Sequence, residues 1–386
     1  MSLVRSMRFE VLLLLLLSAN NLTSISPDNA TFIDVVYIFI PLFFYCVFHK
    51  FISFNGYFLY FVLYFEAMFS VLISPQAGFT STAVTYFLYC VLVLLISSIP
   101  FTPHQLRKFE KYYNYLAIIC CILIILSWMA GITNGENRYS IGIVGVKKNQ
   151  NYVNDIILLS FAFLLSKMYF TNRIRLKEIA LILLFFFACF LTGTRAALLT
   201  LGLLALVYIF LIFLKKGKKS IAIWIILLGS LGIFLLFNIL PPEIAERFIG
   251  EGSSEDNLRT LMWANNYLEF IKSPFLGMGL GQTDVINAKT VILENDTGDI
   301  LSLHNVLLQF LYEQGILGVL IFIVILRGII KRFRKEDRLF GVLMMLALYF
   351  PISFQNGLVG FVFWWPLMLL EIYSRTSKRQ GLISTY

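Results

Sequence analysis

The sequence predicts an all-α, polytopic integral membrane protein with about 12 transmembrane helices. Of its 386 residues, 59% are hydrophobic and only 14% are charged, and the mean hydropathy is +0.81. Apolar runs of about 20 residues, the length that crosses a hydrocarbon core of about 30 Å, recur along the whole chain. These runs are continuous instead of alternating, so a transmembrane β-barrel is excluded.

The expected spans follow the apolar runs in order. They cover residues 9–26, 31–48, 52–73, 80–99, 114–132, 152–169, 178–194, 196–214, 220–240, 304–326, 339–354 and 357–373. Residues 1–19 resemble a signal peptide, but the cleavage region is unconvincing and more spans follow, which favours an uncleaved first helix. All five cysteines fall within apolar runs without metal-ligand spacing, so we interpret them as small apolar residues.

The charges of the connections alternate along the chain. Most of the 31 basic residues lie in every second connection, which the positive-inside rule assigns to the cytoplasm together with both termini. We interpret these basic clusters as solvated loops facing lipid headgroups, so the net charge of +9 does not indicate nucleic acid. The exceptions on the outer side are Arg138, Lys147, Lys148, Arg195, Arg247, Arg259, Lys272 and Lys289.

One connection is long, faces outward and is rich in acidic residues: residues 241–303. Within it, residues 257–271 carry apolar side chains at helical spacing, which predicts an amphipathic helix lying against the membrane face. Its N-cap is expected near Ser253–Ser254. The glycine-rich segment 274–281 ends this helix, and without a strand–turn–helix context its pattern is only a weak signal for a nucleotide loop.

A histidine at the junction of this loop with the next span is the strongest candidate for chemistry. His304 lies at the outer surface, next to Asn305, whereas His49 and His104 lie in cytoplasmic connections. Glu313 follows on the same helix, and a carboxylate at that depth is costly unless it faces a cavity or a partner. Its role stays open between a buried hydrogen bond that holds helices together and a functional contact.

Basic residues on the outer face add a second signal. Arg195 occupies a tight turn between two spans, where a guanidinium group suits bidentate contact with phosphate oxygens, although an interfacial arginine can also extend to headgroups. Arg259 lies on the amphipathic helix, and Arg247 is a weaker candidate. Further positive potential comes from Arg138, Lys147 and Lys148 in one loop. This set predicts a phosphate-bearing substrate, with His304 as the base or the group that positions an acceptor hydroxyl.

Two further patterns have structural interpretations. Gly315 and Gly318 have the spacing of small residues that let helices approach closely, so we expect helix packing there. Asp296 and Asp299 are the nearest approach to a metal-ligand pair, and a solvated loop explains them better.

Together, these motifs resemble the O-antigen polymerase and ligase superfamily of bacterial envelope enzymes, the Wzy and WaaL proteins. The resemblance covers about residues 130–330 and rests on the order and spacing of loose motifs. The motifs are residues 139–145 with 149–151, residues 192–197, residues 259–263 with 273–279, and residues 304–305 with 313–318. We therefore expect N-terminal helices over 1–130, a catalytic region over 131–330, and C-terminal helices with a cytoplasmic tail over 331–386.

The resemblance implies a membrane-embedded glycosyltransferase fold (GT-C type) in the bacterial inner membrane, with a periplasmic active site. It implies inverting, metal-independent transfer of a glycan from undecaprenyl pyrophosphate, with no cofactor. Arg195 and Arg259 match the arginines that hold the pyrophosphate, and His304 matches the histidine thought to activate or orient the acceptor hydroxyl. Asn305, Glu313, Arg247, Arg138, Lys147 and Lys148 are then candidates for substrate binding. Expected partners are the lipid-linked oligosaccharide, membrane lipid, and a chain-length regulator and flippase of the same pathway.

The acceptor stays open between two enzymes. A polymerase transfers the growing glycan onto a lipid-linked repeat unit, and a ligase transfers it onto lipid A–core. The high Phe and Tyr content, 38 and 19 residues, and the divergent first half favour a polymerase. A lipid-linked oligosaccharide flippase is the alternative of another class, and it would be expected to show internal repeats and charges spread through many spans.

Overall fold

The computed structural model is helical over the residues it describes, apart from one two-residue pair of antiparallel strands. It describes residues 11–17, 31–50, 57–73, 81–133, 139, 142–143, 146–147, 150–171, 175–216, 254–287, 303, 305–354 and 361–382. The strands are β1 (Gly142–Ile143) and β2 (Val146–Lys147). The helices are α3 (Thr31–Phe48), α4 (Phe58–Ile73), α5 (Ser81–Ser98), α6 (Pro103–Met129), α7 (Gln150–Thr171), α8 (Leu176–Leu191), α9 (Arg195–Lys216), α12 (Ser254–Phe270), α14 (Val306–Arg332), α15 (Arg338–Ile352) and α16 (Phe361–Gln380). Shorter helical segments cover residues 11–17 and 282–287.

Ten of the twelve predicted spans fall at least in part on the helices α3 to α9 and α14 to α16, and the first predicted span is described only over residues 11–17. Among the described residues, three helices are long and apolar enough to cross a membrane: Pro103–Met129, Asn151–Thr171 and Val306–Arg332. The described apolar helices Ile38–Phe48, Phe58–Leu72, Ala83–Ser98, Arg195–Leu211 and Arg338–Ile352 are shorter. The predicted span at 220–240 lies outside the described residues, so the total of about 12 spans stays a prediction.

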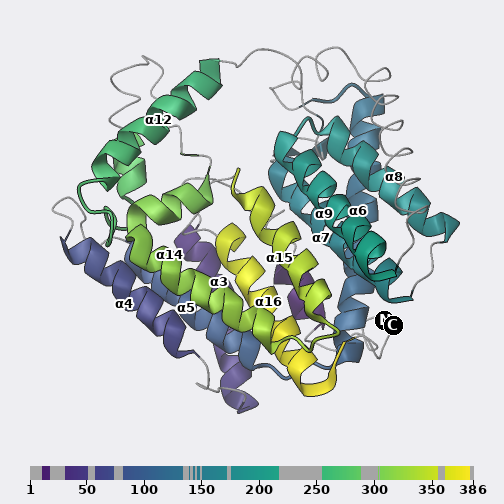
Figure 1. The fold of residues 1–386 in the computed structure, drawn as a ribbon, viewed down its shortest axis with the longest axis horizontal. Coiled ribbons are helices and arrows are strands. Elements are labelled where there is room, and N and C mark those ends of the chain that lie inside the picture. Colours follow the sequence, from purple (N-terminus) through teal and green to yellow (C-terminus); the bar gives the residue numbers. More distant parts are fainter. Residues whose placement is uncertain are drawn as a thin grey trace.

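The helices form one bundle with α14, α15 and α16 at its centre (Figure 1). Helix α14 packs against α4, α15 and α16, whereas α15 packs against α7 and α9 on its other side. Helices α3 and α5 pack together, and α5 also contacts α16. The outward faces keep large exposed side chains, such as Phe65 and Phe69 on α4, as expected for a surface that faces lipid.

Short-range signals set the helix starts. Thr102 caps α6, because its hydroxyl accepts from Gln105 N while the Gln105 side chain accepts from Thr102 N, and Pro103 fills the first helical position. Helix α6 therefore begins well before residue 114, where hydropathy alone predicted a span. The amphipathic helix of the long loop is confirmed as α12, which begins at Ser254.

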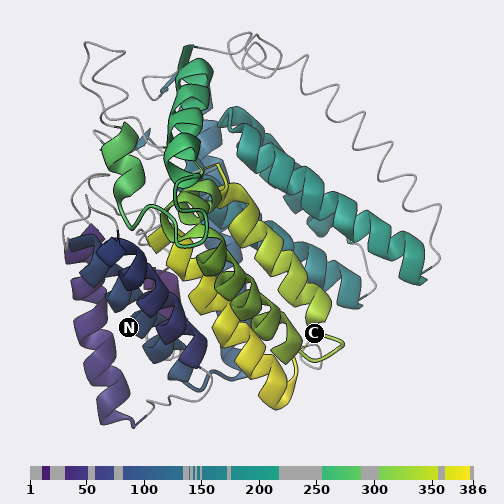
Figure 2. The ribbon, with the colours of Figure 1, turned by 60° about the vertical axis from the view of Figure 1, so that its left-hand side comes forward.

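Helices α7 and α14 run in the same direction. Phe163, in the second half of α7, stacks on Phe340 at the start of α15, with ring centroids 6.0 Å apart. Since α15 follows the end of α14 after a short connection, α7 and α14 begin at the same end of the bundle. We call this the loop end, and Figure 2 shows α12 projecting from it beside the start of α14. The opposite end, where α14 and α16 finish with basic residues, is the basic end.

Candidate functional site

Helix α14 is broken at the loop end. Gly315 has φ 66° and ψ −174°, a backbone conformation that interrupts the helix and that only glycine adopts readily. The break separates a short half-helix, residues 306–314, from the longer remainder of α14, residues 316–332. Asn305 caps the half-helix, because its side chain accepts from Leu308 N at 3.0 Å.

The glycine-rich segment that follows α12 occupies the break. In an uninterrupted helix, Ile316 N would donate to Tyr312 O and Leu317 N to Glu313 O. Instead, Ile316 N donates to Pro274 O at 2.9 Å and Leu317 N to Phe275 O at 3.1 Å.

The carbonyls on the other side of the break also find partners in this segment. Tyr312 O accepts from Met278 N at 2.8 Å, and Glu313 O accepts from Gly279 N at 3.0 Å. The segment thus satisfies both faces of the break, so buried backbone groups keep their partners without a continuous helix.

Two glycines make this contact possible. An added Cβ on Gly315 would lie 2.5 Å from Gly277 N, and one on Gly277 would lie 2.5 Å from Gly315 N. We call residues 273–281 together with the break at Gly315 the interlock. The expectation that Gly315 serves helix–helix packing is therefore wrong, because Gly315 packs against the loop segment. Gly318 does allow close packing with α4, where an added Cβ would lie 3.0 Å from Glu66 Oε2.

Glu313, two residues before Gly315 in the half-helix, is completely buried next to the interlock. One carboxylate oxygen accepts from the Thr283 hydroxyl and from Gln309 Nε2, the latter at 3.2 Å. The other oxygen has no hydrogen-bond partner among the described residues. Thr283 lies in the short helix 282–287, so Glu313 ties the half-helix to the loop through side chains as well as backbone.

A second buried carboxylate lies deeper on α4. Glu66 is buried, and neither of its carboxylate oxygens has a partner in the described part of the chain. Ser70, one turn nearer the loop end, donates to Glu313 O at 2.9 Å, and Gln314 pairs with the Tyr86 hydroxyl. Sequence reasoning missed Glu66, Ser70 and Thr283, although a carboxylate inside an apolar run was a signal for Glu66.

The neighbours of His304 are held in place. Leu303 is buried, and its carbonyl accepts from Trp263 Nε1 on α12 at 2.8 Å. Asn305 on the other side caps α14. His304 itself lies outside the described residues, so its catalytic role stays a prediction.

Arg195 lies at the same end of the bundle, as the first residue of α9. Its side chain is exposed. The preceding turn is anchored to the start of α7, because Asn154 Nδ2 donates to Thr192 Oγ1 at 3.0 Å. This bond connects the start of α7, which includes part of the motif at residues 149–151, to the motif at residues 192–197.

The other predicted residues are placed only in part. Arg259 lies on α12 and Lys147 on β2, and their side chains are not described. Arg138, Arg247 and Lys148 lie outside the described residues. The described cysteines are buried and free, as expected. In the described ranges, no group of three or more His, Cys, Asp or Glu side chains could hold a metal ion.

Comparison with known proteins gives one family match. Residues 180–323 match the family model described as O-antigen ligase, a range that begins in α8 and ends in α14. No curated protein matches the chain. The matched range contains Arg195, α12, the interlock and Glu313, and it supports the resemblance to the O-antigen polymerase and ligase superfamily that the motifs indicated.

Proposed function

We propose that the protein is an O-antigen or capsular surface-polysaccharide polymerase that works at the periplasmic face of the bacterial inner membrane. It would transfer the growing glycan from undecaprenyl pyrophosphate onto a lipid-linked repeat unit. The observation that carries the proposal is the match of residues 180–323, which covers every described part of the loop-end site from Arg195 to Glu313.

The proposed chemistry is an inverting displacement at the anomeric carbon. The acceptor oxygen forms the new bond while the bond to pyrophosphate breaks, and the pyrophosphate leaves with the bonding electrons. His304 takes the hydroxyl proton, and no metal or cofactor takes part. Arg195 and Arg259 neutralise the charge that develops on the leaving group.

The position of Arg195 supports this role. A helix N-terminus presents backbone N–H groups and the positive end of the helix dipole to an anion. Arg195 adds an exposed guanidinium group at the start of the 22-residue helix α9, which suits phosphate oxygens better than a lone surface charge.

The remaining predicted residues have supporting roles in the proposal. Arg138, Lys147, Lys148 and Arg247 would add positive potential for the pyrophosphate. Asn305 would hold the start of α14 beside His304. Glu313, being fully buried, would support the half-helix instead of touching sugar unless the site opens.

A ligase is the second candidate, because the matching family model is described as O-antigen ligase. The ligase would use the same donor and differ only in its acceptor, lipid A–core. A polymerase would work with a flippase and a chain-length regulator of the same pathway, whereas a ligase would accept the finished polymer.

The deciding experiment is deletion of the gene, followed by electrophoresis of the envelope glycolipid. Loss of the ladder with one repeat unit still on the core identifies a polymerase. Polymer that accumulates on undecaprenyl pyrophosphate beside bare core identifies a ligase. Repeat units trapped on the cytoplasmic side, or an unchanged ladder, would overturn the glycosyltransferase proposal, and the trapped units would identify a flippase.

Complementation tests the residues. We expect His304→Ala to match the deletion, and loss of Arg195 or Arg259 to cost about 3–4 kcal/mol of transition-state stabilisation, by analogy with one oxyanion-hole donor. Lys272→Gln is the matched control, because its exposed side chain only pairs with Glu269 on α12 and it should restore the ladder.

A further inference from the structure

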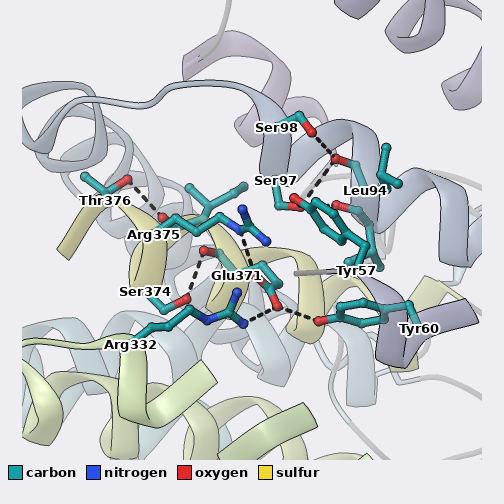
Figure 3. Close-up of polar contacts among 12 residues, drawn as sticks. Tyr57, Tyr60, Leu94, Ser97, Ser98, Arg332, Glu371, Ser374, Arg375 and Thr376 are labelled. Atoms are coloured by element: carbon teal, nitrogen blue, oxygen red, sulfur yellow. Dashed lines mark hydrogen bonds and ion pairs between the residues drawn. The ribbon is translucent and has the colours of Figure 1, made fainter. Parts of the chain in front are cut away.

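The basic end of the bundle contains an ion cluster with an excess of positive charge. Glu371 on α16 is completely buried and is paired with two arginines, Arg332 at the end of α14 and Arg375 one turn further along α16. Figure 3 shows the two guanidinium groups on either side of the Glu371 carboxylate. One carboxylate cannot neutralise two guanidinium groups, so a net positive charge is left at this place.

The carboxylate accepts three hydrogen bonds. Glu371 Oε1 accepts from Arg332 Nη2 and from the Tyr60 hydroxyl, the latter at 2.6 Å, and Oε2 accepts from Arg375 Nε at 2.9 Å. The Tyr57 ring lies under Arg375, with 4.4 Å between Cζ and the ring centroid. The cluster is thus held by contacts from Tyr57, from Tyr60 on α4 and from Glu371 on α16.

Both arginines have donors that remain unused. Arg332 Nε and Arg375 Nη2 are buried and have no hydrogen-bond partner among the described residues. An unpaired buried donor on a charged group is costly. The side chains remain partly exposed, 23% for Arg332 and 16% for Arg375, so the cluster lies close to the surface of the protein.

Two other charged residues near this end have polar partners. Arg107 Nη1 pairs with Glu110 at 2.7 Å. Asp337 accepts from the Ser377 hydroxyl at 2.6 Å and from Leu382 N at 2.8 Å. Other basic residues at this end, such as Lys331 and Lys335, are exposed, whereas Arg332 and Arg375 are held on a buried carboxylate.

We propose that Arg332 and Arg375 bind a phosphate group, and that this phosphate belongs to the headgroup of an anionic membrane lipid. A guanidinium pair matches phosphate oxygens in charge and geometry, and basic pockets between transmembrane helices are suited to anionic headgroups. The lipid phosphate supplies the second negative charge that the cluster lacks. This site lies at the opposite end of α14 from the transferase site and does not depend on the proposed function.

The test uses the full chain, purified in a neutral detergent. Its thermal midpoint is followed against added phosphatidylglycerol, phosphatidylcholine with the same acyl chains, or sodium phosphate. We expect saturable stabilisation by phosphatidylglycerol only. Equal stabilisation by both lipids would overturn the proposal, and stabilisation by sodium phosphate alone would replace its lipid source by free phosphate.

Variants assign the effect to the cluster. Arg332→Gln leaves Glu371 bonded to Arg375 and Tyr60, and it should weaken phosphatidylglycerol binding about fivefold, the contribution of one basic residue near an anionic surface. Lys335→Gln is the matched control, because Lys335 is exposed at the same end of the bundle. If both variants lost the same amount of phosphatidylglycerol binding, the lipid would be attracted by the overall positive charge of this end, and a specific site would be refuted.

A third variant keeps the test decisive if Arg332→Gln does not fold. Glu371→Gln preserves the shape of the side chain and removes the charge that competes with phosphate. Binding of phosphatidylglycerol should become about fivefold tighter, although the unliganded protein loses stability. A purely structural ion cluster predicts the same loss of stability with unchanged or weaker lipid binding, which would overturn the proposal.

Discussion

The two ends of α14 are fixed by different chemistry. At the loop end, the chain is held by backbone hydrogen bonds between residues 273–281 and the break at Gly315. At the basic end, the same helix is held by the charged side chain of Arg332 on buried Glu371. Backbone hydrogen bonds between the two segments require glycines that approach closely, whereas an ion cluster requires side chains of opposite charge.

This difference suits the two ends to different tasks. The glycan site that we propose at the loop end would need a helix terminus and a loop that are held in a defined geometry. An anchor within the bundle needs strong contacts between neighbouring helices, and charged groups provide these where water is scarce. We therefore expect added carbon atoms to destabilise the loop end, and the loss of a charge to destabilise the basic end.

The largest effect is expected from Gly315→Ala. The new Cβ would adopt a left-handed φ and lie 2.5 Å from Gly277 N, next to the Phe275 carbonyl. Left-handed strain and overlap with backbone atoms together should destabilise the fold by about 3–6 kcal/mol. Thermal denaturation in detergent measures the loss.

The matched control lies on the same helix. Gly328 is in the regular part of α14, and an added Cβ there meets nothing within 4 Å. Gly328→Ala should leave stability unchanged or raise it by up to about 1 kcal/mol. Similar losses in both variants would show that the interlock is not the reason for glycine at residue 315.

The basic end is tested by Glu371→Ala. Removing the buried carboxylate leaves two guanidinium groups facing each other without a counter-charge, and breaking such a pair costs about 3–5 kcal/mol. Because both arginines are partly exposed, we expect about 3 kcal/mol, read from the same denaturation experiment.

Glu269→Ala is the control for the removal of a carboxylate. Glu269 pairs with Lys272 on the surface of α12, and both side chains are largely exposed. Surface pairs contribute about 0–1 kcal/mol. If the Glu371 variant lost no more than the Glu269 variant, the basic end would not be an anchor.

The sequence predicted the helices well because hydropathy is a local property. The sequence predicts a turn at Arg195 and a span over residues 196–214. Helix α9 covers Arg195–Lys216. The predicted start of the span at residue 114 was wrong, because hydropathy does not register polar capping residues. The Thr102–Gln105 capping box and Pro103 were readable in the sequence and place the start of α6 at residue 103.

The site was less predictable because its contacts are distant in sequence. Gly315 fitted a helix-packing pattern, and nothing local shows that Gly277, almost forty residues earlier, lies against it. The basic residues at the end of α14 were interpreted as solvated, yet Arg332 lies within the helix and reaches Glu371. Residue type and position make His304, Asn305 and Glu313 candidates, whereas the Thr283 partner of Glu313 is visible only in the fold.

An intermediate effect is expected from Thr283→Val at the loop end. Valine has nearly the same shape but cannot donate to Glu313, which would leave a buried carboxylate with Gln309 as its remaining side-chain donor. A hydrogen bond to a charged group contributes about 1.5–3 kcal/mol. Thr283→Ser retains the hydroxyl and should keep most of the stability, so equal losses in the two variants would contradict a role for the bond.

The smallest effect on stability is expected from Trp263→Phe, which separates stability from positioning. The variant loses only the Nε1–H donor to Leu303 O, 2.8 Å away, and should cost about 0.5–1.5 kcal/mol. Because Leu303 directly precedes His304, the proposed function predicts a larger fall in ladder formation than this loss of stability explains. Tyr267→Phe, which alters an exposed ring on the same helix, should leave stability unchanged. If Trp263→Phe forms a normal ladder, the bond to Leu303 stabilises the loop without positioning the histidine.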